Sequence, residues 1–311
     1  MSDPQPPPVG RGLRRATVDT VTRVARGARG TRGTRLASGR GDSRHWRHVG
    51  PMRMRYGPAR GQRADLWLPA PPPAQLVAQP AGARVPIVVL LHGGFWTWPY
   101  TKVLMTGLAR DVRARGWAAW NVEYRRLGRL GGDGGYPATF DDVAAAVDHL
   151  ARLPEAIGDR LDLTRVVLCG HSAGGTLALW AAGRTGAVAI RGAIGLAPVA
   201  DLAEAERRGI GGDAIARLLG GGAKERSERY AACSPAERVP CPVPVVLVHG
   251  RKDATVPVGM SEEHVARQQQ AGGDAELVVV DATHRSLLRH RGPGWVAVTR
   301  RIATLSERDV T

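Results

Sequence analysis

The sequence predicts an α/β fold with a central, mostly parallel β-sheet, helices on both faces of that sheet and a small helical insert. Short apolar runs alternate along the chain with segments of helical periodicity. The runs are nearly continuous in apolar residues, which is typical of strands buried on both faces of a parallel sheet. With 311 residues, of which 43% are hydrophobic, the chain is long enough for one large domain with a substantial core.

The strand pattern begins just after residue 52. Segments 53–56 and 64–68 alternate in polarity and predict two strands, and a Pro-rich connector follows at 69–86. The predicted buried strands are 87–91, 118–122, 166–169, 193–196, 245–248 and 277–280.

Helical patterns separate these strands. The predicted helices are 101–115, 141–153, 173–183, 257–271 and 293–305. In 141–153, for example, Val143, Val147 and Leu150 recur at i, i+4 and i+7. Strands that alternate with helices in this way predict right-handed crossovers in a doubly wound sheet. Segment 201–232 is polar and Gly-rich and fits no strand, so we expect it to be a helical insert over the sheet edge.

Residues 1–50 differ from the rest of the chain. They hold eleven arginines and three aspartates, a net charge of +8 out of +16 for the whole chain. Because such a segment buries too little apolar surface to offset its ordering entropy, we expect a disordered Arg-rich extension at 1–50 and a folded catalytic domain at 51–311. Two alternatives stay open: a translation start nearer the fold, at Met52 or Met54, and a tail that binds nucleic acid or another polyanion.

Composition and spacing argue against several other classes of protein. No run approaches the roughly 18 consecutive apolar residues that a membrane helix needs, and the N-terminus lacks the apolar stretch of a secretory signal, even behind Arg14-Arg15. The three cysteines form neither a disulfide framework nor a Cys-x-x-Cys pair. We therefore expect a cytoplasmic protein with no membrane partner, no metal ion and no organic cofactor.

The motif that carries chemistry is Gly170-His171-Ser172-Ala173-Gly174, a Gly-x-Ser-x-Gly pattern between a predicted strand and a predicted helix. This is the context of a nucleophile elbow, a strained turn that exposes the serine hydroxyl while glycines relieve crowding on each side. Ser172 is therefore the candidate nucleophile.

A serine hydroxyl needs a base, and the base needs an acid that orients it. Asp253 lies just after the predicted strand 245–248, and His284 lies four residues after the strand 277–280. Both therefore belong to loops at the carboxyl ends of strands, where open α/β sheets place their sites. The order Ser172, Asp253, His284 is the one expected for this kind of elbow.

Other acids and histidines compete for these roles. Asp201, which follows the strand 193–196, is the alternative acid, whereas Asp281 is too close in sequence to His284 to reach it from a separate loop. We expect His264 to be a solvated helical residue and His290 to lie in a surface turn. His171 occupies the variable position of the elbow and is not a candidate base.

The segment His92-Gly93-Gly94-Phe95-Trp96 follows the predicted strand 87–91 and predicts an oxyanion hole. The expected donors are the backbone N–H groups of Gly94, Phe95 and Ala173. We expect the ring of His92 to brace this loop. Trp96 and Trp98 either line the pocket or pack the loop, and the sequence does not decide between the two.

From about residue 54 to 305, the chain resembles α/β-hydrolases of the esterase and kynurenine-formamidase-like group, close to the prolyl-oligopeptidase-type hydrolase domain. The resemblance is carried by His92-Gly-Gly-Phe-Trp96, Asn121-Val-Glu-Tyr-Arg125, Gly170-His-Ser-Ala-Gly-Gly175, His249-Gly-x-x-Asp253-x-x-Val-Pro257 and His284. It implies the α/β-hydrolase fold and structural roles for Glu123 and Arg125 in support of the oxyanion loop. Ala282-Thr283 departs from the acidic or glycine neighbours common before the histidine of that group.

Residues and resemblance together predict a Ser-His-Asp hydrolase of small carboxylic esters. An arylformamidase that cleaves an aryl amide of the N-formylkynurenine type would use the same machinery and is the first alternative. A catalytically silent α/β-hydrolase that serves as a binding module is the second. The Arg-rich tail gives a further alternative, a nucleic-acid-binding protein, although the folded part has no recognition motif.

The composition of residues 1–50 generates a first prediction. A chain that starts at His48 is expected to fold and to hydrolyse a small neutral ester with unchanged kcat/KM, because no candidate catalytic residue precedes Gly94. If the tail has a function, it should be electrostatic: the full chain would be retained on heparin, retention would fall with added salt, and truncation would largely abolish it. A truncated protein that is soluble but inactive, or that still binds heparin, would contradict this reading of the tail.

Overall fold

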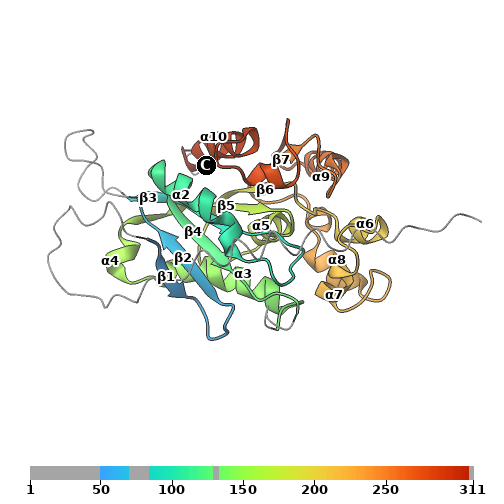
Figure 1. Cartoon of the computed structure of the whole chain (residues 1–311), viewed down its shortest axis with the longest axis horizontal. Coiled ribbons are helices and arrows are strands. Elements are labelled where there is room, and N and C mark those ends of the chain that lie inside the picture. Colours follow the sequence, from blue (N-terminus) through green and yellow to red (C-terminus); the bar gives the residue numbers. More distant parts are fainter. Residues whose placement is uncertain (1–49, 70–83, 129–132, 308–311) are drawn as a thin grey trace, which may run out of the picture. The chain divides into compact units, whose positions relative to one another are not determined.

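One eight-stranded sheet organises the part of the chain that the computed structural model describes, residues 50–69, 84–128 and 133–307. The strands are β1 (Met52–Arg55), β2 (Arg63–Trp67), β3 (Val85–Leu91), β4 (Ala118–Glu123), β5 (Leu161–His171), β6 (Ile190–Leu196), β7 (Val245–Gly250) and β8 (Ala275–Val280). Their order in the sheet is β1-β2-β4-β3-β5-β6-β7-β8 (Figure 1). β2 pairs antiparallel with both β1 and β4, and the remaining neighbours pair parallel, so the sheet is mostly parallel, as predicted.

Helices connect the strands. The α-helices are α2 (Thr106–Ala114), α3 (Ala138–Asp148), α4 (Glu155–Gly158), α5 (Ala173–Ala182), α6 (Leu202–Arg207), α7 (Ala214–Leu219), α8 (Ser227–Cys233), α9 (Val258–Gln270) and α10 (Pro293–Glu307). Short 3-10 helices are η2 (Lys102–Met105), η3 (His149–Arg152), η4 (Pro235–Glu237) and η5 (Arg285–Leu288). Within the described ranges, no helix combines the length and apolarity needed to cross a membrane.

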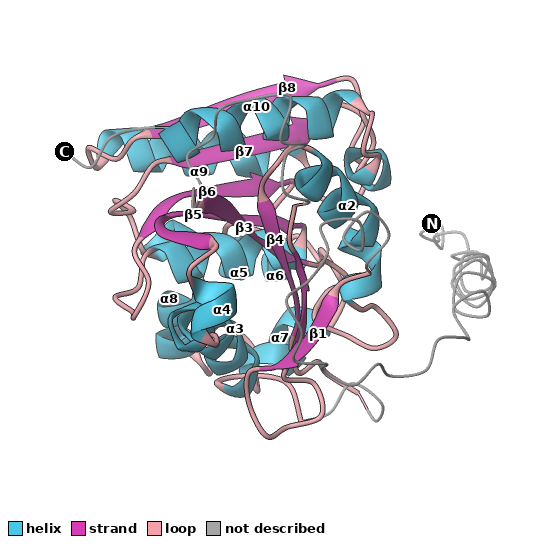
Figure 2. Ribbon diagram, turned by 90° about the vertical axis from the view of Figure 1, so that its left-hand side faces the viewer, coloured by secondary structure: helices cyan, strands magenta, loops and turns pink. Residues whose placement is uncertain are grey.

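Side chains that alternate along the central strands build a core on each face of the sheet. In β3, Ile87, Val89 and Leu91 pack into one core with side chains of α3, α5 and α9. Val88 and Leu90 of the same strand pack into the other core, with side chains of α2 and α10. A strand has a two-residue period, so this strand must be apolar on both faces, and helices cover both of them (Figure 2).

The six predicted buried strands and five predicted helices are confirmed with shifted ends. Among the strands, β5 shows the largest shift. It begins at Leu161, which pairs with Val85 of β3, and its pairing with β3 resumes at Val166 after a register shift. Segment 201–232 is helical as predicted and forms α6, α7 and α8. Residues 1–49 of the expected extension and most of the connector 69–86 lie outside the described residues.

The register aligns the carboxyl ends of the parallel strands along one edge. Leu91 pairs with Gly170, His171 with Leu196, and Gly250 with Val280. The non-glycine residues with positive φ among those described are Phe95, Trp96, Ser172 and Ala197, and each follows a strand at this edge. Such backbone conformations cluster at functional sites, so this edge is where a site is expected.

A buried carboxylate fixes α3 to the end of β4. The Asp142 side chain has no exposed surface and accepts hydrogen bonds from the Arg125 guanidinium, at 2.6 and 2.9 Å, and from the Arg125 backbone N–H. It also accepts from the Gln62 amide at 2.7 Å. Because each oxygen has partners, the desolvated charge is compensated.

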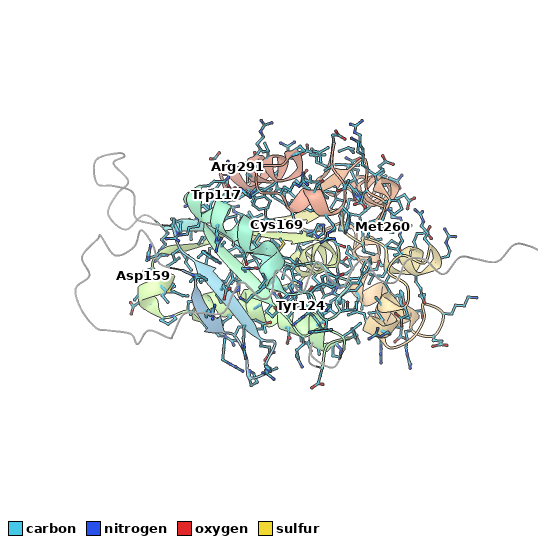
Figure 3. The ribbon with its side chains drawn as sticks, in the orientation of Figure 1. Trp117, Tyr124, Asp159, Cys169, Met260 and Arg291 are labelled. Atoms are coloured by element: carbon cyan, nitrogen blue, oxygen red, sulfur yellow. The ribbon has the colours of Figure 1, made fainter. Side chains whose placement is uncertain are left out.

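This pairing generates a stability prediction. Asp142→Ala should lower the free energy of unfolding in urea by about 3–5 kcal/mol, because Arg125 and Gln62 lose their acceptor in a buried place. Asp159 gives the matched control, since it lies at the surface (Figure 3) and its pair with Arg84 is mostly exposed. Asp159→Ala should cost less than about 1 kcal/mol. Equal losses in the two variants would show that burial of the Asp142 charge has no special weight.

Candidate active site

Ser172 lies on a tight turn between β5 and α5. Its φ of 53° and ψ of −124° are strained for a residue with a side chain, a conformation that costs about 1–3 kcal/mol. The turn is held because the Ser172 N–H donates to the Leu196 carbonyl at 2.8 Å. A Cβ at Gly174 would overlap with the carbonyl oxygens of Leu91 and His92, so the helix approaches β3 only with glycine there. The predicted elbow geometry is therefore present at Ser172.

Asp253 and His284 meet beside this turn, from the loops after β7 and β8. His284 Nδ1 donates to Asp253 Oδ2 at 2.7 Å. The other carboxylate oxygen, Oδ1, accepts from the N–H groups of Thr255 at 2.8 Å and Val256 at 2.9 Å. The structure thus brings the predicted acid and the predicted base together.

Two opposing influences act on the Asp253 carboxyl. Burial raises its pKa, while hydrogen bonds from His249 and His284, and that from the Val256 N–H, lower it. The donors prevail and hold the pKa of Asp253 well below its ordinary value. The carboxylate is therefore ionised, as an orienting acid must be.

His249 is a neighbour of this site that the sequence did not single out for a role. It lies near the end of β7, is fully buried, and has its Nε2 3.4 Å from Asp253 Oδ2 and 2.9 Å from the Val256 carbonyl. Its Nδ1 is 2.7 Å from the hydroxyl of Ser261 on α9. The His249-Gly-x-x-Asp253 spacing was visible in the sequence, but nothing in it showed that the histidine folds back onto the aspartate.

His171 contacts the loop of His284, a role that its variable position in the elbow did not predict. Its Nε2 donates to the His284 backbone carbonyl at 3.0 Å, and the two rings lie 4.6 Å apart. Burial, and then the charge of His284, lower the pKa of His171 to about 3, so the ring is neutral. The residue before Ser172 therefore ties the nucleophile turn to the loop of His284.

The candidate oxyanion donors lie at the same edge. Gly94 has a φ of 113° and Phe95 a φ of 49°, so the chain turns sharply after β3. Ala173 begins α5, and the first N–H groups of a helix have no acceptor within the helix. The structure places all three predicted donors on the segments that flank Ser172.

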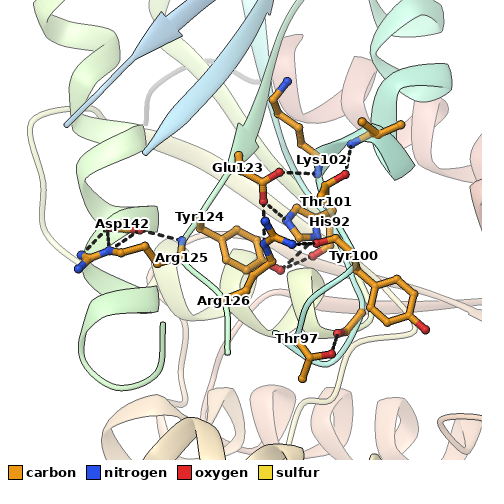
Figure 4. Close-up of polar contacts among 12 residues, drawn as sticks. His92, Thr97, Tyr100, Thr101, Lys102, Glu123, Tyr124, Arg125, Arg126 and Asp142 are labelled. Carbon is orange, nitrogen blue, oxygen red and sulfur yellow. Dashed lines mark hydrogen bonds and ion pairs between the residues drawn. The ribbon is translucent and has the colours of Figure 1, made fainter. Parts of the chain in front are cut away.

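A buried network braces the loop after β3 (Figure 4). The Tyr124 hydroxyl donates to the His92 carbonyl at 2.7 Å, and the two rings stack at 4.3 Å. His92 Nε2 lies 3.0 Å from Glu123 Oε1, and the Lys102 N–H donates to Glu123 Oε2 at 3.1 Å. The ring of His92 is thus a brace, as expected.

The carboxylate at the centre of this network is ionised. Burial raises the pKa of Glu123, but the charge of His92, the hydrogen bond from His92 and the charge of Arg126 together bring it below its ordinary value. Arg126 Nε lies 3.1 Å from Glu123 Oε1, whereas the neighbouring Arg125 turns away to Asp142. Glu123 and Arg125 are both structural, but the contacts to the loop come from Glu123, Tyr124 and Arg126.

The competing residues have other roles. Asp201 caps α6, where it accepts from the Glu204 N–H at 3.0 Å, and it pairs with Arg267 at 3.3 Å. Asp281 pairs with Lys252 at the surface. The expectation that His264 is solvated is wrong, because the residue lies on a buried position of α9. His290 is exposed, as expected.

The two tryptophans of the loop after β3 differ in burial. Trp96 is fully buried and packs the loop, while half of the Trp98 surface is exposed. The helical insert 201–232 reaches the same loop, since a Cβ at Gly211 would overlap with the Phe95 ring. The insert therefore borders the loop that carries two of the candidate oxyanion donors.

Comparisons with known proteins agree on the architecture. Residues 76–267 match the model of the family BD-FAE, and a comparison with proteins of curated function gives no match. A thermophilic esterase of the Planctomycetes species Thermogutta terrifontis, Est2, is similar with 20% identity and a TM-score of 0.62 over 83% of this chain and 90% of that one. A truncated carbohydrate esterase from gut microbiota is similar with 16% identity and a TM-score of 0.68, over 84% and 100% of the two chains. Esterase B from Lactobacillus rhamnosis is similar with 19% identity and a TM-score of 0.66, over 82% and 85%.

The buried neutral His171 generates a prediction on stability and pH. Its folded pKa of about 3 lies below the ordinary value of 6.5, so the unfolded chain takes up the proton first as the pH falls. The stabilisation is complete above pH 6.5 and is lost toward pH 3, with a slope of up to about 1.4 kcal/mol per pH unit. Between pH 7.5 and 5, the wild type should therefore lose about 2 kcal/mol more unfolding free energy than His171→Gln, which keeps a donor but does not titrate.

Urea unfolding at the two pH values measures this difference. His290→Gln is the control, because it removes an exposed histidine and should leave the pH dependence of the wild type in place. The same pH dependence in His171→Gln as in the wild type would contradict the assignment.

Proposed function

The chain belongs to the BD-FAE family, and on that premise we propose that it is a serine hydrolase that cleaves small carboxylic esters. The observation that carries the proposal is the 2.7 Å hydrogen bond between His284 and the buried Asp253, at the sheet edge where Ser172 occupies its strained turn. The three similar solved structures described above are themselves called esterases, which supports ester hydrolysis as the reaction.

In the proposed reaction, the Ser172 hydroxyl attacks the acyl carbon of the ester while the neutral imidazole of His284 accepts its proton. Asp253 holds the Nδ1–H tautomer of His284, so the free Nε2 is the atom that accepts. The ionised carboxylate then stabilises the imidazolium that forms. His284 gives the proton to the departing alcohol, and water attacks the acyl-enzyme in the reverse sense to release the acid.

The tetrahedral intermediate needs donors for its oxyanion. The N–H groups of Gly94, Phe95 and Ala173 are the proposed donors, and the loss of one donor of this kind typically lowers the rate by about 10²–10³. The network under the β3 loop supports this role, because Tyr124 and Glu123 hold His92 and with it the start of the loop. A preformed loop needs no reorganisation when the charge develops.

The proposal predicts the effect of three substitutions. Ser172→Ala, His284→Ala and Asp253→Asn should each lower kcat for a short chromogenic ester by several orders of magnitude, because the three residues act as a unit. Asp201→Asn is the matched control and should leave kcat nearly unchanged, since Asp201 caps α6 and contacts none of the three. A phosphonate should form a covalent adduct with the wild type, located at Ser172 by mass spectrometry, and none with Ser172→Ala.

A substrate panel tests the reaction class. Esters of increasing acyl length are compared with N-formylkynurenine, and we expect the highest kcat/KM on a short ester. A preference for the formamide would replace the esterase proposal with an arylformamidase. Full activity of Ser172→Ala would overturn the nucleophile, and loss of activity in Asp201→Asn alone would overturn the acid.

A further inference from the structure

We infer that His249 is a positioning residue that holds the Asp253 carboxylate in register with His284. The inference rests on the proposed function, in which Asp253 is the orienting acid. It concerns a residue that contacts neither substrate nor the reacting atoms, because the His249 side chain has no exposed surface.

The contacts of His249 determine which of its ring nitrogens carries the hydrogen. Its Nε2 lies 2.9 Å from the Val256 carbonyl, which can only accept, so Nε2 carries a hydrogen. The same nitrogen lies 3.4 Å from Asp253 Oδ2, a long contact in which the hydrogen is shared between two acceptors. Asp253 Oδ2 therefore has two histidine donors, His284 at 2.7 Å and His249 at the longer distance.

Hydrogen bonds at both nitrogens hold the orientation of the His249 ring. With the hydrogen on Nε2, Nδ1 is the nitrogen that accepts the hydroxyl hydrogen of Ser261 at 2.7 Å. Ser261 is buried on α9, a helix that packs against the core. The ring is thus clamped from both nitrogens and does not turn without breaking a buried hydrogen bond.

The contacts among Asp253, Val256 and His249 form a closed cycle. The Val256 N–H donates to Asp253 Oδ1 at 2.9 Å, and the Val256 carbonyl accepts from His249, which in turn contacts Asp253 Oδ2. Both carboxylate oxygens are therefore tied to the same short segment. The terminal torsion of an aspartate is otherwise broad, so this cycle limits rotation of the carboxylate plane. His284 receives a fixed partner rather than a mobile one.

Loss of the His249 Nε2 donor should therefore lower kcat and leave KM nearly unchanged. The carboxylate gains freedom to rotate, so fewer His284 rings are aligned for proton transfer, while substrate binding is untouched. A hydrogen bond to a charged group accounts for about 10- to 100-fold in rate, so kcat should fall by that factor and KM should stay within about twofold.

Two amide substitutions separate positioning from packing. The Gln side chain carries its amide near the position of Nε2, so His249→Gln keeps a donor for Asp253 and Val256. The Asn side chain is shorter and reaches only the position of Nδ1, so His249→Asn keeps the contact with Ser261 and loses the donor. We expect His249→Gln to retain kcat within a few-fold and His249→Asn to show the 10- to 100-fold loss, with rates normalised to the folded fraction measured by circular dichroism.

A second measurement does not depend on activity. The proton on Nδ1 of His284 should give a low-field NMR signal in the wild type, identified by its disappearance in Asp253→Asn. In His249→Asn this signal should shift or broaden, and in His249→Gln it should stay close to its wild-type position. Equal kcat in His249→Asn and the wild type with an unmoved signal would overturn the inference, as would a loss expressed in KM. A wild type that cleaves no ester, with the signal displaced as expected, would instead reject the proposed function and leave the positioning role standing.

Discussion

The close approach of the Ser172 turn to the end of β3 is the constraint on which the site depends. Leu91 and Gly170 are paired in the sheet, so the turn after β5 and the loop after β3 start at the same level. Glycine at position 174 lets α5 begin directly against the backbone of Leu91 and His92. The candidate nucleophile Ser172 and the candidate oxyanion donors are therefore set relative to each other by backbone packing, and side-chain contacts only refine that arrangement.

Around this contact, buried polar groups are satisfied in separate clusters that each support one loop. Glu123, Tyr124 and His92 support the loop after β3. Val256 and His249 surround Asp253 after β7, and His171 reaches the carbonyl of His284 after β8. Each cluster lies in a region of low solvent access, where an unpaired polar group would be costly, so the loops have little freedom to change shape.

The sequence was informative about everything that depends on local periodicity and order along the chain. Continuous apolar runs located the buried strands, and the order of serine, aspartate and histidine located the three candidate residues on the right loops. Contacts that depend on how a loop folds back could not be predicted, because the periodicity of a sequence carries no information on the path of its loops. His249 approaches Asp253 through a turn four residues long, and the burial of Trp96 but not Trp98 follows from the reversal of the chain at Phe95. The prediction that His264 is solvated was wrong for a related reason. A polar residue on a helix is expected to face solvent unless the segment that covers it is known, and His264 is buried.

The helical insert is joined to two parts of the site at once. Its Gly211 lies against Phe95 of the β3 loop, while its Arg208 pairs with Glu263 of α9 at 3.1 Å, on the same helix as Ser261. Surface segments generally tolerate changes of sequence. In this chain that tolerance is narrowed, because a substitution that reshapes the insert also meets Phe95 and the helix that carries Ser261. Changes of sequence in the insert are therefore expected to be accompanied by changes at these two contacts.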